Sequence, residues 1–357
     1  MNHPPRPDKI EIVEVGYTRH VPHHFISSRK SDHCRYELSL EVARSALSQA
    51  KLSEKQKNKC ALLIGSSGST LIDAESAWLE RHQNQHFIPL NNPQGHGELA
   101  DKIAAKLNLF GPRYYFGTAC SSSSNALYYG AKLVASGRVP AALVLGMDWY
   151  NNLTVRGFDS LLLLDPECAK PFDVDRKGLT LGEGVAALVI LPESSDNLNW
   201  RLLGGASVAD HQSPTQTTAE QIAYVIDQAL TNSDVTSKQI TAVKAHGTAT
   251  PNNDSAEGQG ISQVFGTQHP PISSLKGAFG HTLGACGAVE AAALMACVDR
   301  GVWPKCKGLE NSDPECLIKP CLESVSLPSG GAGKYLLNFF GFGGNNSALV
   351  MERRNVD

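Results

Sequence analysis

One cysteine stands where an aromatic, strand-like segment gives way to a helical one. The segment Tyr114–Gly117 is followed by Thr118, Ala119 and Cys120, and then by serines at 121–124. Serine is a common N-cap residue, so we expect Cys120 at the turn from the strand into the helix. The partial positive charge at a helix N-terminus would lower the pKa of this thiol. A lone cysteine is more often a small buried apolar residue, but this position predicts a nucleophile.

A histidine follows an apolar stretch in the second half of the chain. His246 comes directly after Ile240–Ala245, which we expect to be a strand. The carboxyl ends of strands are where α/β sheets carry catalytic loops. Asp254 and Glu257 follow closely and can order this loop through hydrogen bonds. Taken alone, His246 is more readily an ordinary polar loop residue, so its role depends on its neighbours in the fold.

A second histidine, His281, lies five residues after Lys276 and just before the apolar segment Thr282–Cys297. A helix that is apolar on nearly every face is buried. Glu290 is its only charged residue, and a buried carboxylate needs a partner, for which Lys276 is the nearest candidate. Further on, the glycine-rich stretch Gly341–Asn346 can bring backbone N–H groups close to a developing oxyanion.

The elements that must position these residues are predicted in the same layout twice. We expect residues 1–35 to be irregular. In the first half, hydrophobic periodicity predicts helices at 38–49, in pieces over 75–110 and from 121 to 134, and strands at 61–65, 114–117, 141–146 and 185–191. In the second half it predicts helices at 219–230 and 282–298, and strands at 240–245, 271–274, 336–340 and 347–351, the last two antiparallel. A duplicated α/β unit, divided near residues 192–196 into 1–195 and 196–357, explains the pattern.

The composition excludes several classes of protein. Hydrophobic residues make up 41% of the chain and charged residues 19%, as in a globular enzyme, and the net charge of −3 gives no field for nucleic acid. The nine cysteines have no closely paired spacing, so we expect no metal. The chain has no long apolar stretch and begins without a signal-peptide pattern. We therefore expect a cytoplasmic protein with reduced thiols and no membrane span.

Four segments together resemble the β-ketoacyl-[acyl-carrier-protein] synthases, the elongating condensing enzymes of fatty-acid and type II polyketide synthesis. They occur in the order and spacing of that family: Gly117–Cys120, Ala245–Pro251, Lys276 with Gly280–His281, and Gly341–Gly344. Residues 174–184 are also similar to a segment of these enzymes. The resemblance covers about residues 110–352. It implies the thiolase fold, in which two βαβαβ-type halves form a five-layered α-β-α-β-α arrangement.

The resemblance also implies a mechanism and a role for each candidate residue. Cys120 would take an acyl group from a carrier-protein thioester, and His246 and His281 would promote malonyl decarboxylation and stabilise the enolate oxygen. Supporting roles fall to Lys276 and Glu290, which would fix the second histidine, and to Asp254, near the first histidine loop. The backbone at Cys120, Phe342 and Gly343 would form the oxyanion hole, with Phe342 as a gate. Lys170 would help to dock the carrier protein, whose phosphopantetheine arm is the only prosthetic group implied.

The chain departs from this family mainly before Cys120, where it is several tens of residues short. The usual apolar opening strand and its glycine turn are replaced by Ile10–Tyr17, and Asn345–Asn346 stands where Thr-Asn is usual. The missing cap helps in the family to form the acyl tunnel and part of the carrier-protein surface. Family members pair through the strand before the elbow, so we expect a homodimer, or a heterodimer with a related ketosynthase-like chain.

Other functions are weighed against the condensing reaction. The alternative is a chain-length factor, a ketosynthase-like partner subunit with little activity of its own. Such partners usually lack the nucleophile, so Cys120 with both histidines favours an active enzyme, whereas the short first half favours the partner. Starter-condensing enzymes carry asparagine where His281 stands, and thiolases use a second cysteine. A hydrolase would leave the pair of Lys276 and His281 unexplained.

Overall fold

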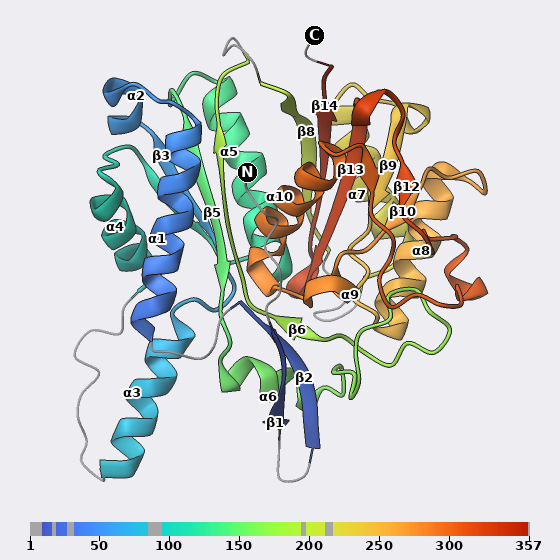
Figure 1. Cartoon of the computed structure of the whole chain (residues 1–357), viewed down its shortest axis with the longest axis horizontal. Coiled ribbons are helices and arrows are strands. Elements are labelled where there is room, and N and C mark those ends of the chain that lie inside the picture. The colour runs from blue at the N-terminus through green and yellow to red at the C-terminus, as the bar shows by residue number, and fades with distance from the viewer. Residues whose placement is uncertain are drawn as a thin grey trace.

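The apolar segments of the chain form two β-sheets that sandwich a pair of helices. The computed structural model describes residues 9–15, 19–26, 32–84, 95–193, 198–210 and 217–355. Figure 1 shows the layers side by side, with α1 and α4 outside the first sheet, α5 and α10 between the sheets, and α8 beyond the second. This is the five-layered arrangement that was predicted. Within the described residues, no helix is both long and apolar enough to cross a membrane.

The first sheet has the strand order β4-β3-β5-β7. Its strands are β3 (Ala61–Gly65), β4 (Arg113–Phe116), β5 (Ala142–Asp148) and β7 (Gly184–Ile190). The described helices before β4 in the chain are α1 (Asp32–Gln49), α2 (Glu54–Asn58), α3 (Leu71–Asn84) and α4 (His96–Leu107). Every residue of β3 and β5 is buried, because these parallel central strands are covered on both faces.

The second sheet has the strand order β10-β9-β13-β14-β8. Its strands are β8 (Trp200–Ala209), β9 (Ile240–Lys244), β10 (Ile272–Ser273), β13 (Gly333–Gly341) and β14 (Asn345–Arg353). Its outer helices are α7 (Ala219–Asn232) and α8 (Pro251–Phe265), and a small ribbon joins β11 (Val302–Trp303) to β12 (Val325–Ser326). The antiparallel pairing of β13 with β14 confirms the predicted pair, whereas β8 was not predicted.

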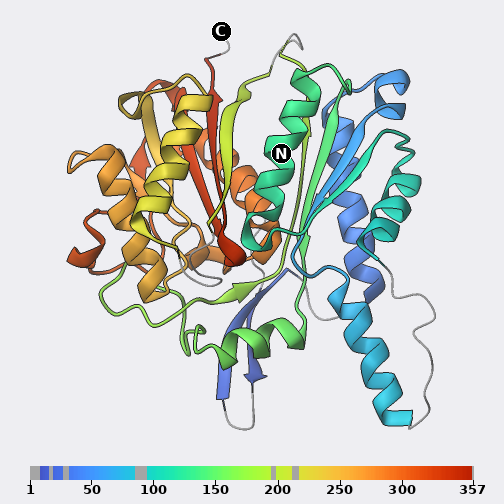
Figure 2. The ribbon, with the colours of Figure 1, turned by 180° about the vertical axis from the view of Figure 1, so that it is seen from behind.

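The two central helices hold the halves together. They are α5 (Ser122–Ala135) and α10 (Cys286–Val298), and Figure 2 shows them between the sheets from behind. The helix that was predicted to begin at residue 282 begins at Cys286 instead, after one 3₁₀ turn over Leu283–Ala285. Gly287 allows the close approach, because a Cβ there would overlap the backbone nitrogen of Ser124. Small residues at this contact therefore set the distance between the two halves.

The prediction that residues 1–35 are irregular is wrong for those of them that the structure describes. They form a hairpin of β1 (Lys9–Val15) and β2 (Arg19–Phe25), and β2 pairs in parallel with β6 (Leu181–Gly182). Figure 1 shows this hairpin below the layers, beside α6 (Asn152–Ser160). Polar residues and Pro22 hid these strands from the sequence pattern. The predicted boundary near 192–196 stays a prediction, since residues 194–197 lie outside the described part.

Candidate active site

Cys120 lies in a strained elbow between β4 and α5. The turn is a 3₁₀ helix over Ala119–Ser121, and Ala119 has φ +49°, a left-handed value that non-glycine residues seldom adopt. The predicted place of Cys120, at the start of the helix, is therefore correct. The expected serine N-cap is not formed with the described residues, because the Ser121 side chain makes no cap hydrogen bond. Instead the Ser122 hydroxyl stabilises the elbow by donating to the Ala119 carbonyl at 2.6 Å.

His281 faces the cysteine directly. Its Nε2 lies 3.0 Å from the Cys120 sulfur, and both side chains are buried. The backbone N–H of Leu283 donates to Nδ1 of His281 at 3.2 Å, so in the neutral ring the proton is on Nε2. The backbone of His281 is bonded on both sides to the segment around β6, through Thr180 (2.7 Å) and Gly182 (3.0 Å). His281 therefore presents an N–H donor to the sulfur from a fixed position.

His246 approaches the same point from the end of β9. Its backbone N–H and that of Gly247 donate to the two oxygens of Glu257, each at 2.7 Å. Its ring nitrogen Nδ1 lies 3.3 Å from the ammonium of Lys276, which also donates to the His246 carbonyl at 2.7 Å. Asp254 secures the rest of the loop by accepting from the N–H of Ala249 at 3.1 Å. The predicted ordering of this loop by two carboxylates is confirmed.

Both histidines are neutral hydrogen-bond donors. Burial, followed by the charge of Lys276, lowers the pKa of His246 and of His281 well below the ordinary value. The two rings lie edge to face with centroids 5.3 Å apart. Because a donor occupies Nδ1 in each ring, each Nε2 carries the proton and is left for the pocket. Two converging N–H groups suit an oxygen that gains negative charge.

The same geometry bears on metal binding. The sulfur of Cys120 and one nitrogen of each histidine lie within 4.8 Å of one another, which is a ligand set that zinc accepts. A metal ligand needs an unprotonated ring nitrogen, however, and both Nε2 atoms carry their proton. The donors at Nδ1 would have to be given up before a metal could bind, so these residues do not fit a resident metal.

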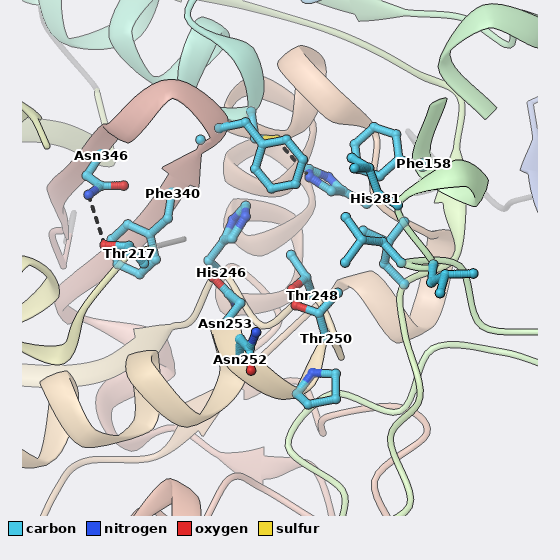
Figure 3. Close-up of a pocket in the computed structure, with 18 of the residues that line it drawn as sticks. Phe158, Thr217, His246, Thr248, Thr250, Asn252, Asn253, His281, Phe340 and Asn346 are labelled. Carbon is cyan, nitrogen blue, oxygen red and sulfur yellow. Dashed lines mark hydrogen bonds between the residues drawn. The ribbon is translucent and has the colours of Figure 1, made fainter. Parts of the chain in front are cut away.

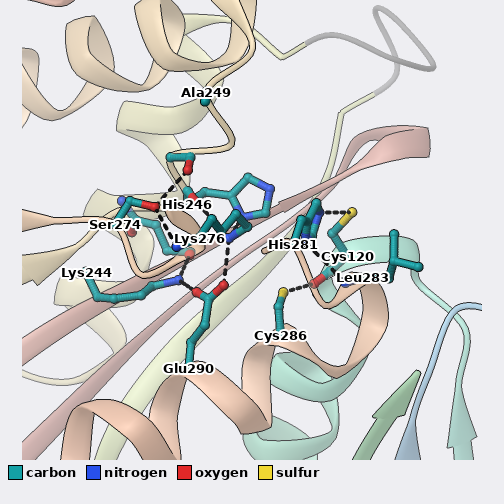
Figure 4. Close-up of polar contacts among 12 residues, drawn as sticks. Cys120, Lys244, His246, Ala249, Ser274, Lys276, His281, Leu283, Cys286 and Glu290 are labelled. Atoms are coloured by element: carbon teal, nitrogen blue, oxygen red, sulfur yellow. Dashed lines mark hydrogen bonds and ion pairs between the residues drawn. The ribbon is translucent and has the colours of Figure 1, made fainter. Parts of the chain in front are cut away.

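Behind the histidines, the predicted pair of Lys276 and Glu290 is present. Lys276 Nζ lies 2.7 Å from Glu290 Oε1, and a second lysine, Lys244, contacts Oε2 (Figure 4). Although burial disfavours its charge, Glu290 raises the pKa of Lys276, so this lysine stays an ammonium. Lys244 was missed as a site residue, but a lysine inside an otherwise apolar strand was a signal for a buried partner.

The pKa of Cys120 runs against expectation. Burial raises it to about 11, opposed by the charge of Lys276 and by the backbone N–H groups of Phe342 and of Cys120 itself. The predicted lowering by the helix N-terminus is therefore wrong, because the thiolate loses more solvation than the elbow returns. The two backbone N–H groups lie beside the sulfur. The oxyanion of a thioester attacked by Cys120 would form next to them, so the predicted oxyanion hole stays a prediction.

A pocket of about 430 Å³ opens onto Cys120, His246 and His281. Figure 3 shows the two histidines and Phe158 around this space, with Thr248 and Thr250 beside them. Phe158 stacks on Phe342 with ring centroids 5.6 Å apart, so an aromatic pair covers part of the site. The exposed Leu161 and Leu162 also line the pocket, which makes its outer part apolar.

Not every predicted position lies in this pocket. The supporting residues Lys276, Glu290 and Asp254 lie behind the lining, and Lys170 and Gly343 are also outside it; Lys170 is half-buried and Gly343 is in a turn with φ +77°. The lining includes Phe158 and the exposed Lys177, which the sequence did not single out. Neither position had a local signal, since both depend on where α6 and the following loop fold back.

Comparisons with known proteins find similar sequences and similar structures. Residues 27–196 match the family described as β-ketoacyl synthase, N-terminal domain, and residues 202–310 match its C-terminal domain. A 3-oxoacyl-[acyl-carrier-protein] synthase 2 from Synechocystis is 30% identical over 87% of this chain and 80% of its own length. For the chloroplastic 3-oxoacyl-[acyl-carrier-protein] synthase II of Arabidopsis thaliana the identity is 28%, and the chain spans 60% of that protein. A ketosynthase in complex with its chain length factor, from Xenorhabdus doucetiae, superposes with a TM-score of 0.82 at 27% identity, over 97% of this chain and 90% of that one.

Proposed function

Because the chain belongs to the β-ketoacyl synthase family, we propose that it condenses an acyl group held on Cys120 with a malonyl unit, with loss of carbon dioxide. The observation that carries the proposal is the meeting of one thiol with two imidazole donors in one pocket, His281 Nε2 being 3.0 Å from Cys120 Sγ. The product would be a β-ketoacyl thioester lengthened by two carbons, in fatty-acid or polyketide synthesis.

The first half-reaction transfers the acyl group. The sulfur of Cys120 attacks the thioester carbonyl carbon, and the backbone N–H groups of Cys120 and Phe342 stabilise the oxyanion. The bond from the carbonyl carbon to the pantetheine sulfur then breaks. The proton of the Cys120 thiol leaves with the departing pantetheine thiol, and the acyl group remains on the enzyme as a thioester.

The second half-reaction makes the carbon–carbon bond. The bond to the malonyl carboxylate breaks, carbon dioxide leaves, and the electron pair forms an enolate whose oxygen accepts from Nε2–H of His246 and His281. The enolate carbon attacks the acyl carbonyl, the bond to Cys120 sulfur breaks, and the thiolate regains a proton from solvent. Neutral histidines suit this step because each already carries an N–H at Nε2 and donates without first taking up a proton.

The acyl donor would be an acyl carrier protein, as the names of the Synechocystis and Arabidopsis relatives indicate for those enzymes. Its phosphopantetheine arm brings the thioester, so no other cofactor is required. Lys177, exposed in the pocket lining, and the half-buried Lys170 are the proposed contacts for its acidic surface. Lys177→Glu should weaken the rate with carrier-bound substrate while leaving a small thioester substrate unaffected; equal losses with both would remove the docking role.

We also propose that a second ketosynthase-like chain, identical or related, covers the edge of β4. A groove of about 740 Å³ lies there, and Tyr114 and Tyr129 in its lining are 42% and 43% exposed. The Xenorhabdus ketosynthase pairs with a chain length factor, which makes a related partner as reasonable as a second copy. Light scattering on the chain alone and with pathway partners tests this; an active monomer would contradict it.

The described cysteines are free thiols, which supports a cytoplasmic location.

Intact-mass spectrometry after incubation with acyl-carrier protein tests the proposed function. We expect one acyl adduct on the wild-type chain and none on Cys120→Ala, followed by loss of the adduct when malonyl-carrier protein is added. An adduct on Cys120→Ala would contradict the assignment of the nucleophile. A wild-type chain that is never acylated, alone or with a partner, would favour the chain-length-factor function instead.

A further inference from the structure

Lys244 is a second fully buried lysine beside the catalytic histidines, two residues before His246 on β9. Its Nζ contacts Oε2 of Glu290 and donates to the carbonyl of Asn338 at 2.6 Å. The third side of the ammonium faces the ring of Phe339, 3.6 Å from its centroid. All three directions of the ammonium are therefore occupied, by a carboxylate, a carbonyl and an aromatic face.

The contacts of Lys244 close a ring of hydrogen bonds that includes His246. From Glu290 the ring runs through Lys276 to the His246 carbonyl (2.7 Å each), and from the His246 N–H to Glu257 (2.7 Å). The side-chain amide nitrogen of Asn338 donates to Glu257 at 3.3 Å. The backbone carbonyl of Asn338 accepts from Lys244, which returns the ring to Glu290. Every member of the ring is buried. His246 is thus held from both sides of its backbone.

The ring divides the carboxylate of Glu290 between two lysines. Oε1 faces Lys276 and Oε2 faces Lys244, so the carboxylate has one stable orientation (Figure 4). Lys276 in turn spends its three N–H groups on Oε1 and on the carbonyl and Nδ1 of His246. Without Lys244, Oε2 would be unpaired and the carboxylate could turn, carrying Lys276 away from the imidazole.

We propose that Lys244 is a positioning residue for His246: by holding Oε2 of Glu290 it keeps Lys276 on Nδ1 and thereby keeps the Nε2 proton of His246 in the pocket. Lys244 contacts no reacting atom. The inference rests on the proposed function for its effect on the rate, but not for its effect on the imidazole tautomer.

The experiment compares the wild-type chain with Lys244→Met, which keeps an unbranched side chain but removes the ammonium. Decarboxylation of malonyl-carrier protein should fall about 10- to 100-fold in kcat with little change in KM, as for a misplaced catalytic group. Acylation of Cys120 should stay within about twofold, since His281 and the backbone donors serve that step. The matched control is Lys305→Met, the same change at a half-exposed lysine, which should alter neither rate.

Nitrogen-15 NMR of the histidine rings supplies the second readout. His246 should be the Nε2–H tautomer in the wild-type chain and should gain the Nδ1–H form in Lys244→Met, with His281 unchanged. An Nδ1–H wild-type His246 would overturn the proposal, and this measurement needs no variant to fold. A Lys244→Met variant that folds and keeps both the wild-type tautomer of His246 and the wild-type decarboxylation rate would also overturn the proposal. If the wild-type chain has no decarboxylase activity the proposed function fails, while the tautomer comparison still decides the role of Lys244.

Discussion

The two halves of the molecule share a strand order and then diverge at one edge. The second sheet ends with β8 antiparallel to β14, whereas among the described residues the first sheet ends at β7, with four strands against five. The N-terminal residues that would supply another strand form the β1–β2 hairpin instead. This hairpin pairs with β6, and Leu181 of β6 is bridged to His281. The hairpin of the first half therefore supports the turn that carries His281 in the second half.

The halves also divide the chemistry unequally. The first half supplies the sulfur of Cys120, held by a strained elbow. The second supplies both histidines and the buried ring of charges behind them. A nucleophile needs only to be presented at a turn, whereas two neutral donors need fixed tautomers, and these require buried partners. Four experiments test this comparison of the two halves, in their chemistry and in the contacts that hold them.

The largest effect is expected from the histidines themselves. His246→Ala and His281→Ala should each slow malonyl decarboxylation by roughly 10²–10⁴-fold, the scale of one positioned donor. Of the two histidines, His281 is the one within hydrogen-bonding distance of the sulfur, so His281→Ala should also slow the acylation of Cys120, while His246→Ala should not. Single-turnover measurements separate the two steps. Equal slowing of acylation in both variants would remove the distinction between the two rings.

The contact between the halves is tested with two glycines in helices. Gly287→Ala places a methyl group on the backbone of Ser124 and should lower the free energy of unfolding by about 3 kcal/mol. Gly97→Ala is the matched control, because a Cβ at that position meets nothing within 4 Å; it should stabilise α4 by roughly 0.5–1 kcal/mol. Urea denaturation measures both. A Gly287→Ala variant as stable as the wild-type chain would show that the central helices have room to separate.

The pH dependence of thiol reactivity tests which influence dominates at the elbow. With its pKa raised to about 11, Cys120 is protonated at neutral pH. Its alkylation rate by iodoacetamide should rise about tenfold per pH unit above pH 7 and level off only near the pKa. In the urea-unfolded protein the alkylation rate should level off at about pH 8.5, which is the ordinary pKa of a thiol. A plateau near neutral pH in the folded chain would mean that the helix N-terminus outweighs burial.

The smallest effect concerns the hairpin. Glu183 accepts from the backbone N–H of Tyr150 (3.1 Å) and of Ile26 (3.3 Å), which ties the end of β2 to the loop before α6. Glu183→Gln leaves one of these donors without an acceptor and should destabilise the hairpin by about 1–2 kcal/mol. Amide exchange should quicken over residues 19–26 but not in β13. Unchanged exchange in the hairpin would show that other contacts hold it.

The sequence predicted what depends on neighbouring residues and missed what depends on distant ones. Apolar runs such as 61–65 and 240–244 were assigned correctly because burial leaves a local pattern. The pair of Lys276 and Glu290 followed from a single charge in an apolar helix. Phe158 could not be foreseen, since its stacking on Phe342 depends on the return of α6 to the pocket. The convergence of Cys120 and His281 was implied only by the family resemblance.

The contact between Cys120 and His281 joins residues that are 161 positions apart. Contacts of such sequence separation form late in folding, because each half must close before the two can dock. During refolding, the circular-dichroism signal of the helices should therefore recover before the alkylation rate of Cys120 falls to its low value in the folded chain. The reactivity of Cys120 therefore reports when the two halves dock. A fast alkylating reagent, added at different times of refolding, should modify Cys120 before docking and be excluded from it afterwards.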